Sequence, residues 1–437
     1  MKSDIIIIGS GPGGYQAAAY AAKNGLSVTI IEERHAGGTC LNEGCIPTKT
    51  LCHEAEVLET LRSALPSACI DYARLNQRLE EVITQLRSGV EQMMGMPGIT
   101  FVQGHAAFKD AHTIVVNDEE YTSDKIIIAT GSKPKMPPHC DIDANMVSTS
   151  TEVLQLDHLP ESIVIVGAGV IGMEFASIFN SFGSEVTVIE FLKECLPSVD
   201  SDIAKRLRKT MEKRGITFHM QSAVKRIDAG GVTFERKGKE ETVSAETILV
   251  ATGRMPNTEG LCLEAAGVEY SPKGITTDDD MHTNVEGIYA IGDVNGRQML
   301  AHAATMQGYK VVNEILGKPS AIRLDIMPAA IFTRPEAACV GPSEDYCKEN
   351  GIGYTCRKAF FRSNGKAVTM GETDGMLKLL ADDNDKIIAC HCYGPHAADI
   401  VQEISALMCR DTTVSQLADM VHIHPTLGEI VHEATLS

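Results

Sequence analysis

The stretch that decides the fold is DIIIIGSGPGGYQAAAYAAKNGLSVTIIE, residues 4–32. A run of isoleucines ends in glycines with the spacing G-x-G-x-x-G, at Gly9, Gly11 and Gly14, and an alanine-rich helix leads to an apolar strand that ends at Glu32. Such glycines let a pyrophosphate approach the N–H groups at a helix N-terminus, and an acid at the end of the second strand accepts ribose hydroxyls. Residues 4–32 therefore predict a parallel β-α-β unit that binds a dinucleotide.

The same pattern returns in SIVIVGAGVIGMEFASIFNSFGSEVTVIE, residues 162–190, with Gly167, Gly169, Gly172 and a terminal Glu190. In both copies the acid follows the first glycine by 23 residues. One glycine triplet is weak evidence, because turns into helices use glycine routinely. Two copies in the same strand-helix-strand context predict two dinucleotide sites.

Composition limits the class of protein. The 437 residues suffice for about three domains, and 39 Lys and Arg against 58 Asp and Glu give a net charge of −19, so nucleic acid is not an expected partner. The opening MKSDIIIIGS predicts a strand and not a signal peptide, and the other apolar stretches are too short for a membrane span. A cytoplasmic protein without membrane association is expected, in which most of the 13 cysteines are reduced.

Three further segments border the nucleotide units. IIIATGS (126–132) and ILVATGRMPN (248–257) are typical of strands that close on tight turns, although ordinary strand ends look the same. TNVEGIYAIGDVNG (283–296) places Asp293 at a strand end, where it is either a buried structural acid or a partner for a flavin ribityl hydroxyl. Glu190 would repel a 2′-phosphate and no Arg lies in EFLKEC (190–195), so the second site is expected to prefer NAD(H) to NADP(H).

After about residue 326 the pattern changes. GMLKLLADDNDKIIACHCYG (375–394) predicts an antiparallel sheet and ADIVQEISALMCR (398–410) a helix. Strand alternation would place Cys390 and Cys392 on one face and His391 on the other, which favours core packing over a metal site. The predicted fold is α/β, with two Rossmann-like dinucleotide-binding domains and a C-terminal α+β domain. The expected segments are 1–145, 146–258, 259–325 and 326–437.

Two cysteines five residues apart, Cys40 and Cys45, lie in GGTCLNEGCIPTKTLC (37–52). A zinc clip would need a second matching pair, which the sequence lacks. On a regular helix five residues advance about 7.5 Å, whereas bridged Cα atoms lie within about 6.8 Å, so a disulfide needs a distorted turn that Gly44 could supply. A helix start at Cys45, with Lys49 one turn on, would favour a thiolate. A redox disulfide is therefore preferred to a structural one, and Glu43 between the cysteines is expected to oppose thiolate formation.

These motifs, with YAIGD (289–293) and HIHPTLGE (422–429), together resemble the flavin-dependent pyridine nucleotide:disulfide oxidoreductases over essentially the whole chain, and within that family the lipoamide branch. The resemblance implies FAD and NAD as cofactors. It assigns Gly9, Gly11, Gly14, Glu32 and Asp293 to FAD and Gly167, Gly169, Gly172 and Glu190 to NAD, and it adds Lys49, Gly131, Gly253 and Ala301 to the cofactor-binding residues.

The resemblance also implies roles for side chains. Cys40 would exchange with the substrate, Cys45 would face the flavin, and Lys49 would pair with Glu174 near the flavin edge. His424 and Glu429 would form an acid/base pair that reaches the disulfide of the other subunit of a homodimer. From the residues alone, His422 and His424 on one strand face could equally be a surface pair or half a metal site.

The activity that the resemblance implies is oxidation of dihydrolipoamide carried by lipoyl-bearing subunits of 2-oxo acid dehydrogenase or glycine cleavage complexes. The alternatives are another NAD(P)H-dependent disulfide or mercuric ion reductase of the family, and a flavin- and NADH-binding protein without thiol chemistry. A mercuric reductase would favour a cysteine pair near the C-terminus, which the sequence lacks.

Overall fold

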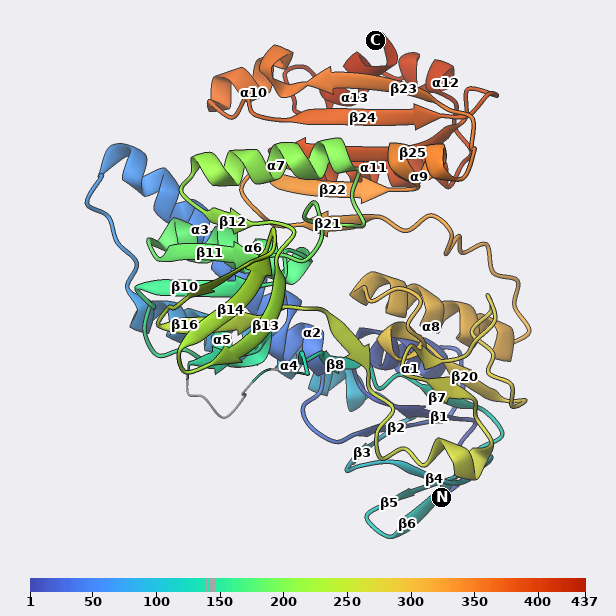
Figure 1. The fold of residues 1–437 in the computed structure, drawn as a ribbon. Coiled ribbons are helices and arrows are strands. Elements are labelled where there is room, and N and C mark those ends of the chain that lie inside the picture. Colours follow the sequence, from blue (N-terminus) through green and yellow to red (C-terminus); the bar gives the residue numbers. More distant parts are fainter. Residues whose placement is uncertain (139, 141–145) are drawn as a thin grey trace. The chain divides into compact units, whose positions relative to one another are not determined.

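A computed structural model describes residues 1–138, 140 and 146–437 (Figure 1). The chain divides into two compact units, each of which is considered by itself. The first unit contains Met1–Thr50, Ala73–Lys135 and Gly253–Leu324. The second contains Leu51–Tyr72, Met136–Thr252 and Asp325–Ser437.

The first unit is built on a parallel sheet with the strand order β20-β7-β1-β2-β3. Ile5 and Ile7 of the central strand belong to the core on one face, and Ile6 and Ile8 to the core on the other. Burial on both faces explains why this strand is an unbroken run of isoleucine and does not alternate with polar residues. The strands are β1 (Ile5–Ile8), β2 (Val28–Glu32), β3 (Ile99–Gln103), β7 (Ile126–Ile128) and β20 (Ile288–Ala290).

Helices α1 (Pro12–Lys23) and α8 (Ala301–Ile315) pack against each other beside this sheet (Figure 1). Alanines of α1 belong to the core on that face, which allows the helices to approach closely. The segment after β2 forms the short α2 (Gly38–Glu43) and begins α3 (Cys45–Ala64), and α4 (Tyr72–Met94) precedes β3. β20 pairs with β7, so a segment near residue 290 completes the sheet that residue 5 begins.

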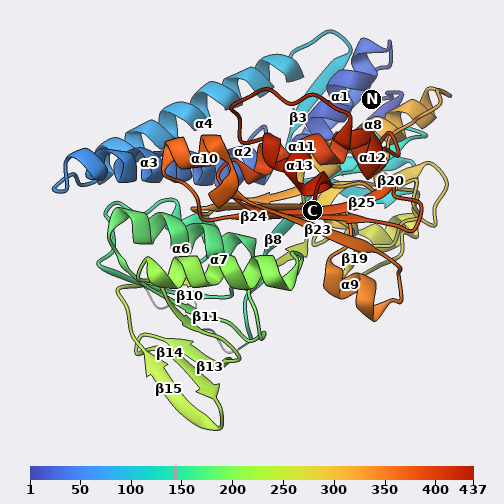
Figure 2. The same cartoon turned by 90° about the horizontal axis from the view of Figure 1, so that it is seen from above.

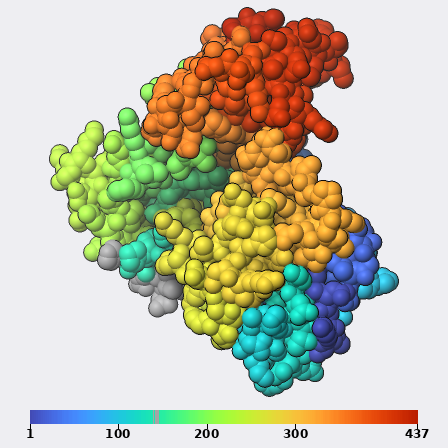
Figure 3. Space-filling model, turned by 90° about the vertical axis from the view of Figure 1, so that its right-hand side faces the viewer, coloured from blue at the N-terminus to red at the C-terminus, as the bar shows by residue number. Residues whose placement is uncertain are grey.

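Small antiparallel elements complete the first unit. An antiparallel meander of β4 (Ala107–Asp110), β5 (Thr113–Val116) and β6 (Glu119–Thr122) forms the cyan part of its surface in Figure 3. β8 (Ser132–Pro134) pairs with β17 (Arg254–Pro256), and β18 (Tyr270–Ser271) pairs with β19 (Gly274–Ile275). Short 3-10 helices are η1 (Leu263–Ala266) and η2 (Gly292–Asn295).

The second unit contains another parallel sheet, with the order β12-β11-β10-β16-β9. Its strands are β9 (Val147–Ser148), β10 (Ser162–Val166), β11 (Glu185–Ile189), β12 (Thr217–His219) and β16 (Thr247–Val250). Its helices are α5 (Ser150–Val153), α6 (Val170–Phe182) and α7 (Ser201–Lys213). Figure 2 shows the meander β13 (Ala223–Asp228), β14 (Gly231–Arg236) and β15 (Lys239–Val243) extending from this part of the unit.

The C-terminal part of the second unit is an antiparallel sheet with the order β21-β22-β25-β24-β23. Cys390 and Cys392 lie in the hydrophobic core on one face, as predicted, and His391 is buried on the other. The strands are β21 (Ala329–Ile331), β22 (Glu336–Val340), β23 (Thr355–Phe360), β24 (Met376–Ala381) and β25 (Ile387–Gly394). The helical elements are α9 (Glu344–Glu349), η3 (Phe361–Ser363), α10 (Gly365–Met370), α11 (Ala397–Met408), α12 (Val414–Ala418) and α13 (Glu429–Thr435).

Both predicted β-α-β units and the antiparallel C-terminal sheet are confirmed. Among the residues that the structure describes, every helix is too short or too polar to cross a lipid bilayer. The four segment boundaries expected from the sequence stay a prediction.

Candidate functional site

The first glycine loop has a distinct steric task for each glycine. Gly9 has φ +101°, and a Cβ there would lie 2.4 Å from the Ala129 carbonyl oxygen. A Cβ on Gly14 would lie 1.9 Å from the Gly9 carbonyl oxygen, so α1 can approach the loop only at a glycine. A Cβ on Gly11 would meet nothing within 4 Å. The first and third glycines therefore serve packing, and the space beside Gly11 is open for a ligand.

The second loop repeats this arrangement. Gly167 has φ +107° and its Cβ would lie 2.5 Å from the Ala251 carbonyl oxygen, while a Cβ on Gly172 would lie 1.9 Å from the Gly167 carbonyl oxygen. Gly169 again has open space around its missing side chain. Helices α1 and α6 each start at the middle glycine as N-cap and have no side-chain cap. Uncapped N–H groups beside an open glycine fit a pyrophosphate in both loops.

The two acids that are predicted to bind ribose each contact the neighbouring glycine loop. Glu32 Oε2 accepts hydrogen bonds from the Ser10 N–H and the Ser10 hydroxyl, each at 2.8 Å. Glu190 Oε2 accepts from the Ala168 N–H at 2.6 Å, and its Oε1 accepts from the Leu192 N–H at 2.7 Å. Each carboxylate is thus held at its own glycine loop through the residue between the first two glycines. The glycine spacing marks Ser10 and Ala168, although the sequence interpretation did not assign them a role.

Asp293 lies in η2, directly after β20, as the strand-end prediction requires. Its Oδ2 accepts a hydrogen bond of 2.5 Å from the Ser132 hydroxyl, which in turn accepts one of 2.7 Å from Arg254 Nε. Burial raises the pKa of Asp293, while the Ser132 hydrogen bond and the Arg254 charge act to lower it. The sequence interpretation missed Ser132 and Arg254, which follow the glycines of the two predicted tight turns.

Three of the four remaining cofactor candidates, Gly131, Gly253 and Ala301, lie at element ends. Gly131 and Gly253 have φ of +71° and +109°, and a Cβ on either would meet nothing within 4 Å. The Gly131 carbonyl accepts the Asn257 N–H at 3.0 Å, which holds the two segments together. Ala301 is the first residue of α8, whose N-cap Leu300 supplies no side-chain hydrogen bond.

The cysteine loop has the distortion that the spacing predicts. Gly44 separates α2 from α3, and a Cβ there would lie 2.9 Å from the Thr39 carbonyl oxygen and 3.3 Å from the Cys40 Cα. A side chain at this position would therefore push the turn away from Cys40. Cys45 is the first residue of α3, as predicted.

Cys40 and Cys45 are thiols that are hydrogen-bonded to each other. This hydrogen bond and burial raise the pKa of Cys40, whereas the charge of Lys49 acts to lower it. Cys40 is partly buried and Cys45 is exposed.

Lys49 and Glu174, which the resemblance pairs, lie on α3 in the first unit and on α6 in the second. Their contact stays a prediction. Glu174 is 3% exposed, and its Oε1 accepts the Phe332 N–H at 2.9 Å within the second unit.

His424 and Glu429, which are predicted to act as an acid/base pair, are in hydrogen-bond contact. His424 Nδ1 lies 2.9 Å from Glu429 Oε1, and the Thr426 N–H donates to Glu429 Oε2 at 2.8 Å. The hydrogen bond from Thr426, followed by the one with His424, lowers the pKa of Glu429. The His424 side chain is 78% exposed, so the rest of its ring is accessible.

The idea that His422 and His424 share a strand face is wrong. Residues 421–428 form no strand, and the His422 side chain is only 11% exposed, with Nε2 3.0 Å from Glu403 Oε1. The two rings are held by carboxylates of different helices, Glu403 on α11 and Glu429 on α13. Among the residues described here, no three His, Cys, Asp or Glu side chains form a metal-binding group.

Comparisons with known proteins agree with this geometry. Residues 3–308 match the pyridine nucleotide-disulphide oxidoreductase family, and residues 327–435 match the dimerisation domain of that family. The chain is 38% identical to a dihydrolipoyl dehydrogenase of Bacillus subtilis (strain 168), over 99% of this chain and 97% of the relative. It is 36% identical to the mitochondrial dihydrolipoyl dehydrogenase of Pisum sativum, over 100% of this chain and 91% of the relative.

A solved structure is similar as well. The Cu(II) complex of the HOCl-induced flavoprotein disulfide reductase RclA from Escherichia coli matches with a TM-score of 0.88 and 30% sequence identity, over 98% of this chain and 99% of that chain. The glycine loops, the strand-end acids and the cysteine pair all fit these matches. The chain therefore belongs to the pyridine nucleotide-disulphide oxidoreductase family, and it is a flavoprotein disulfide oxidoreductase that uses FAD and a pyridine nucleotide.

Proposed function

We propose that this enzyme oxidises dihydrolipoamide on a lipoyl-bearing protein to lipoamide and reduces NAD⁺, with Cys40 and Cys45 as its redox disulfide. The observation that carries the proposal is the contact between the two thiols across the Gly44 turn, at the start of α3. The two relatives named as dihydrolipoyl dehydrogenases, which match along nearly their whole length, support the substrate. The multienzyme partner is the lipoyl-bearing subunit of a 2-oxo acid dehydrogenase or glycine cleavage complex.

Residues of the chain itself carry out the proton transfer and the disulfide exchange. His424 removes a proton from one substrate thiol, while Glu429 orients its ring. The substrate thiolate attacks Cys40 Sγ, the Cys40–Cys45 bond breaks, and Cys45 leaves as a thiolate. Cys40 is then displaced by the second substrate sulfur and takes up the proton that His424 holds, while His424 accepts the proton of the second substrate thiol, and lipoamide is released. The disulfide has gained two electrons and is now a Cys40 thiol and a Cys45 thiolate with the second proton on His424, and the substrate has lost two electrons.

Cofactors complete the turnover. When bound, FAD would supply the two-electron chemistry that links the reduced cysteines to NAD⁺. FAD would be held by Gly9, Gly11, Gly14, Glu32 and Asp293, and NAD by Gly167, Gly169, Gly172 and Glu190. The other residues expected to bind a cofactor are Lys49, Gly131, Gly253 and Ala301. We infer a preference for NAD because Glu190 would repel a 2′-phosphate. The arginine that contacts this loop, Arg208, is already bound to both oxygens of Glu194, at 2.6 and 2.9 Å.

We infer that the active site is shared between two subunits, with the cysteines of one chain and His424 of the partner subunit. The match of residues 327–435 to a dimerisation domain supports a homodimer. Val421 and Ile423 are 98% and 78% exposed, and they lie beside the two histidines. Exposed aliphatic side chains of this kind are typical of a surface that a partner covers.

The test is a steady-state comparison. Purified FAD-loaded enzyme is assayed with dihydrolipoamide, glutathione disulfide, mercuric ion and cupric ion, each with NAD(H) and with NADP(H). Dihydrolipoamide with NAD⁺ should give the highest kcat/KM. The proposal fails if another oxidant exceeds lipoamide in the reverse direction, or if NADP(H) serves as well as NAD(H).

A second candidate is a reductase of another disulfide or of a metal ion. The similarity to a Cu(II) complex of a flavoprotein disulfide reductase favours it, and the exposed Cys45 beside Cys40 is a soft ligand pair. Mercuric and cupric ions in the same assay distinguish this candidate. Titration with dithionite tests the alternative of a flavin- and NADH-binding protein without thiol chemistry. Uptake of about four electrons per subunit indicates flavin plus disulfide, and uptake of about two indicates flavin alone.

A further inference from the structure

The carboxylate inside the cysteine loop has a dedicated counter-charge. Glu43 ends α2 between the two cysteines, and its side chain is only 15% exposed. Both of its oxygens contact the guanidinium of Arg34, Oε2 at 3.2 Å from Nη1 and Oε1 with Nη2. A two-pronged arginine–carboxylate pair is the strong and geometrically specific form of ion pair.

The backbone of Arg34 is itself anchored. Its N–H donates to Glu32 Oε1 at 2.9 Å, and its carbonyl oxygen accepts from Gln103 Nε2 at 3.0 Å. The ion pair therefore connects the ribose acid at the end of β2 to the helix that carries Cys40.

A second arginine, Arg87, binds Asn42, the residue before Glu43. Arg87 Nε of α4 donates to Asn42 Oδ1 at 2.7 Å, and Asn42 Nδ2 donates to the Ala36 and Gly38 carbonyl oxygens at 3.1 and 2.8 Å. Asn42 thereby fixes the start and the end of α2 without placing a charge in it. The direct ion pair with Glu43 is made by Arg34.

Charges on several elements face the thiols. The hydrogen bond with Cys45 and burial raise the pKa of Cys40, and the charge of Lys49 on α3 opposes that rise. The Arg254 guanidinium of β17 interacts electrostatically with both Cys45 and Glu43. Tyr15 of α1 is a neutral neighbour of Cys40 whose pKa is raised, chiefly by burial. Glu43 is thus the carboxylate in a set of cations, and its charge opposes a thiolate unless a cation compensates it.

We propose that Arg34 is a positioning residue that neutralises Glu43, so that the pair as a unit and neither residue alone sets how readily the reduced cysteines form a thiolate. The inference rests on the proposed function, because it assumes that Cys40 and Cys45 are the redox pair. It predicts that replacing Arg34 and replacing Glu43 shift the pH at which the thiolate forms in opposite directions, and that the two shifts cancel when both residues are replaced. Glu43 without Arg34 disfavours the thiolate, and Arg34 without Glu43 favours it.

The experiment measures thiol reactivity and not turnover. FAD-loaded enzyme is reduced, alkylated with iodoacetamide over a range of pH, and the rates at Cys40 and Cys45 are resolved by mass spectrometry. Arg34→Gln should raise the pH midpoint of alkylation by about half a unit, and Glu43→Gln should lower it by a similar amount. Arg34→Gln/Glu43→Gln should return to within about 0.2 unit of the wild type. Arg34→Lys keeps the charge and should shift the midpoint less than Arg34→Gln.

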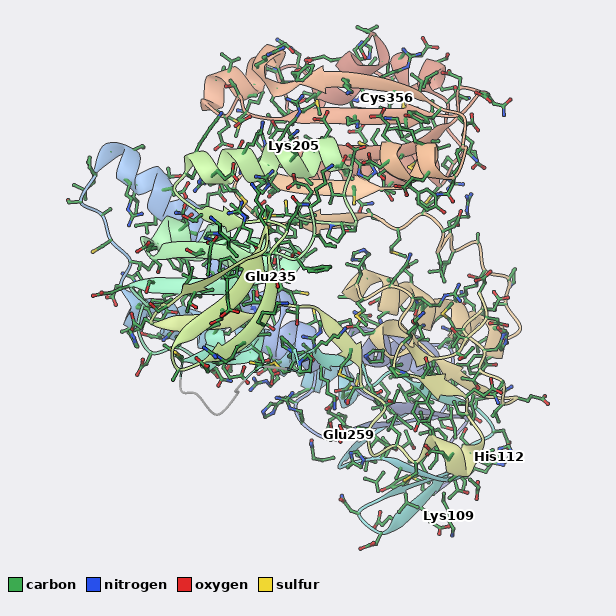
Figure 4. The ribbon with its side chains drawn as sticks, viewed as in Figure 1. Lys109, His112, Lys205, Glu235, Glu259 and Cys356 are labelled. Carbon is green, nitrogen blue, oxygen red and sulfur yellow. The ribbon has the colours of Figure 1, made fainter. Side chains whose placement is uncertain are left out.

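Lys109→Gln is the matched control. Lys109 lies in the meander of the same unit (Figure 4). It pairs with Glu120, and its substitution should leave the midpoint unchanged. The inference is overturned if Arg34→Gln has the wild-type midpoint, if the single shifts fail to cancel in the double variant, or if Arg34→Lys shifts as far as Arg34→Gln. Failure of the redox-pair assignment looks different, since oxidised and reduced wild-type enzyme would then be alkylated equally at both cysteines, and failure of the proposed substrate shows only in the steady-state comparison.

Discussion

At the residue scale, the two strand-end acids, Glu32 and Glu190, occupy the same place in the motif but are followed by different residues. Glu32 and Glu190 accept N–H groups from equivalent loop positions. The residues that follow differ, because Arg34 comes two positions after Glu32, whereas Phe191 and Leu192 follow Glu190 and are 71% and 42% exposed. The first acid therefore has a cation beside it that is bound to Glu43, whereas the second is followed by two exposed apolar side chains.

Replacing Glu190 with arginine tests the nucleotide preference. The wild type should use NAD(H) far better than NADP(H). Glu190→Arg should lower kcat/KM for NAD by about tenfold, which corresponds to about 1.4 kcal/mol, and raise it for NADP, because a ribose acceptor is exchanged for a phosphate partner. Glu185→Arg, at the exposed start of the same strand, should change neither value. A Glu190→Arg enzyme that keeps the wild-type ratio would contradict the assignment.

At the element scale, the cysteine loop depends on a helix that is interrupted at one residue. Cys40 lies on α2 and Cys45 opens α3, and the break at Gly44 replaces the regular rise that would hold the sulfur atoms apart. The Cβ distances at Gly44 show that the turn and Cys40 are in direct contact. The geometry of the thiol pair is therefore a property of the joint between two helices.

Substitution of this glycine should uncouple the thiols. In Gly44→Ala the new methyl group would lie 2.9 Å from the Thr39 carbonyl oxygen, so the turn must open. We expect a loss of at least about tenfold in kcat, because a displacement of about 1 Å at reacting atoms can cost about a hundredfold. A stopped-flow measurement of disulfide reduction checks the same step directly.

Gly89 of α4 provides the control for that substitution. A Cβ on Gly89 meets nothing within 4 Å, so Gly89→Ala should keep full activity and gain up to about 1 kcal/mol of helix stability. Equal activity of both variants would show that the Gly44 turn does not control the cysteine pair.

A buried charge cluster joins three elements of the second unit. Lys378 of β24 is 1% exposed, and its Nζ lies 2.6 Å from both Asp200 Oδ1 and Glu344 Oε2. Asp200 caps α7, and its N–H donates to His391 Nδ1 at 3.1 Å. Burial lowers the pKa of Lys378, but the hydrogen bonds with Asp200 and Glu344 outweigh it and the pKa is raised. The cluster therefore ties helix α7 to the antiparallel sheet.

Removal of this lysine should destabilise the enzyme. Lys378→Met leaves two carboxylates without their buried cation, which typically costs about 3–5 kcal/mol, so the thermal unfolding midpoint should fall by several degrees. Lys358→Met is the matched control, because Lys358 lies directly opposite on β23 and is 40% exposed. Equal midpoints for the two variants would contradict the role of the cluster.

The same cluster predicts a pH dependence. The hydrogen bond from Lys378 lowers the pKa of Glu344 to about 2, from its ordinary value of 4.5. A lowered carboxyl pKa contributes to the free energy of unfolding above about pH 4.5, and that contribution is lost as the pH falls towards 2. The thermal midpoint of the wild type should therefore fall more steeply than that of Lys378→Met between these values. Parallel curves in differential scanning calorimetry would rule out this linkage.

At the scale of the whole molecule, the proposed site needs two chains. The cysteine pair lies near residue 40, and His424 lies in the part of the chain that matches a dimerisation domain. A closed two-fold dimer would exchange these elements reciprocally, so each active site would draw on both chains.

Mixed dimers test the exchange. Homodimers of Cys45→Ser and of His424→Gln should both be nearly inactive. When the two variants are co-expressed in equal amounts with separable tags, one site of each mixed dimer combines intact residues from both chains, so the random mixture should recover about a quarter of wild-type activity. Purified mixed dimers that bind FAD but stay inactive would show that His424 does not act on the partner subunit's cysteines.

Many local features of this fold can be predicted from short stretches of the sequence. The isoleucine runs, the glycine spacings and the cysteine spacing determine the two β-α-β units, the ligand loops and the distorted turn, because each depends on residues within about 30 positions. Tight backbone approaches such as those of Gly14 and Gly172 tolerate no other residue, so the pattern alone reveals them.

Tertiary structure decided which side chains meet. Ser132 and Asp293 are 161 positions apart, and Asp200 and Lys378 are 178 apart, so no local pattern reports either contact. His422 and His424 look equivalent in sequence, yet Glu403 holds one ring in the interior while Glu429 holds the other at the surface. Such partners depend on strand order, register and helix placement, which arise only when distant segments pack together and buried polar groups must find hydrogen-bond partners.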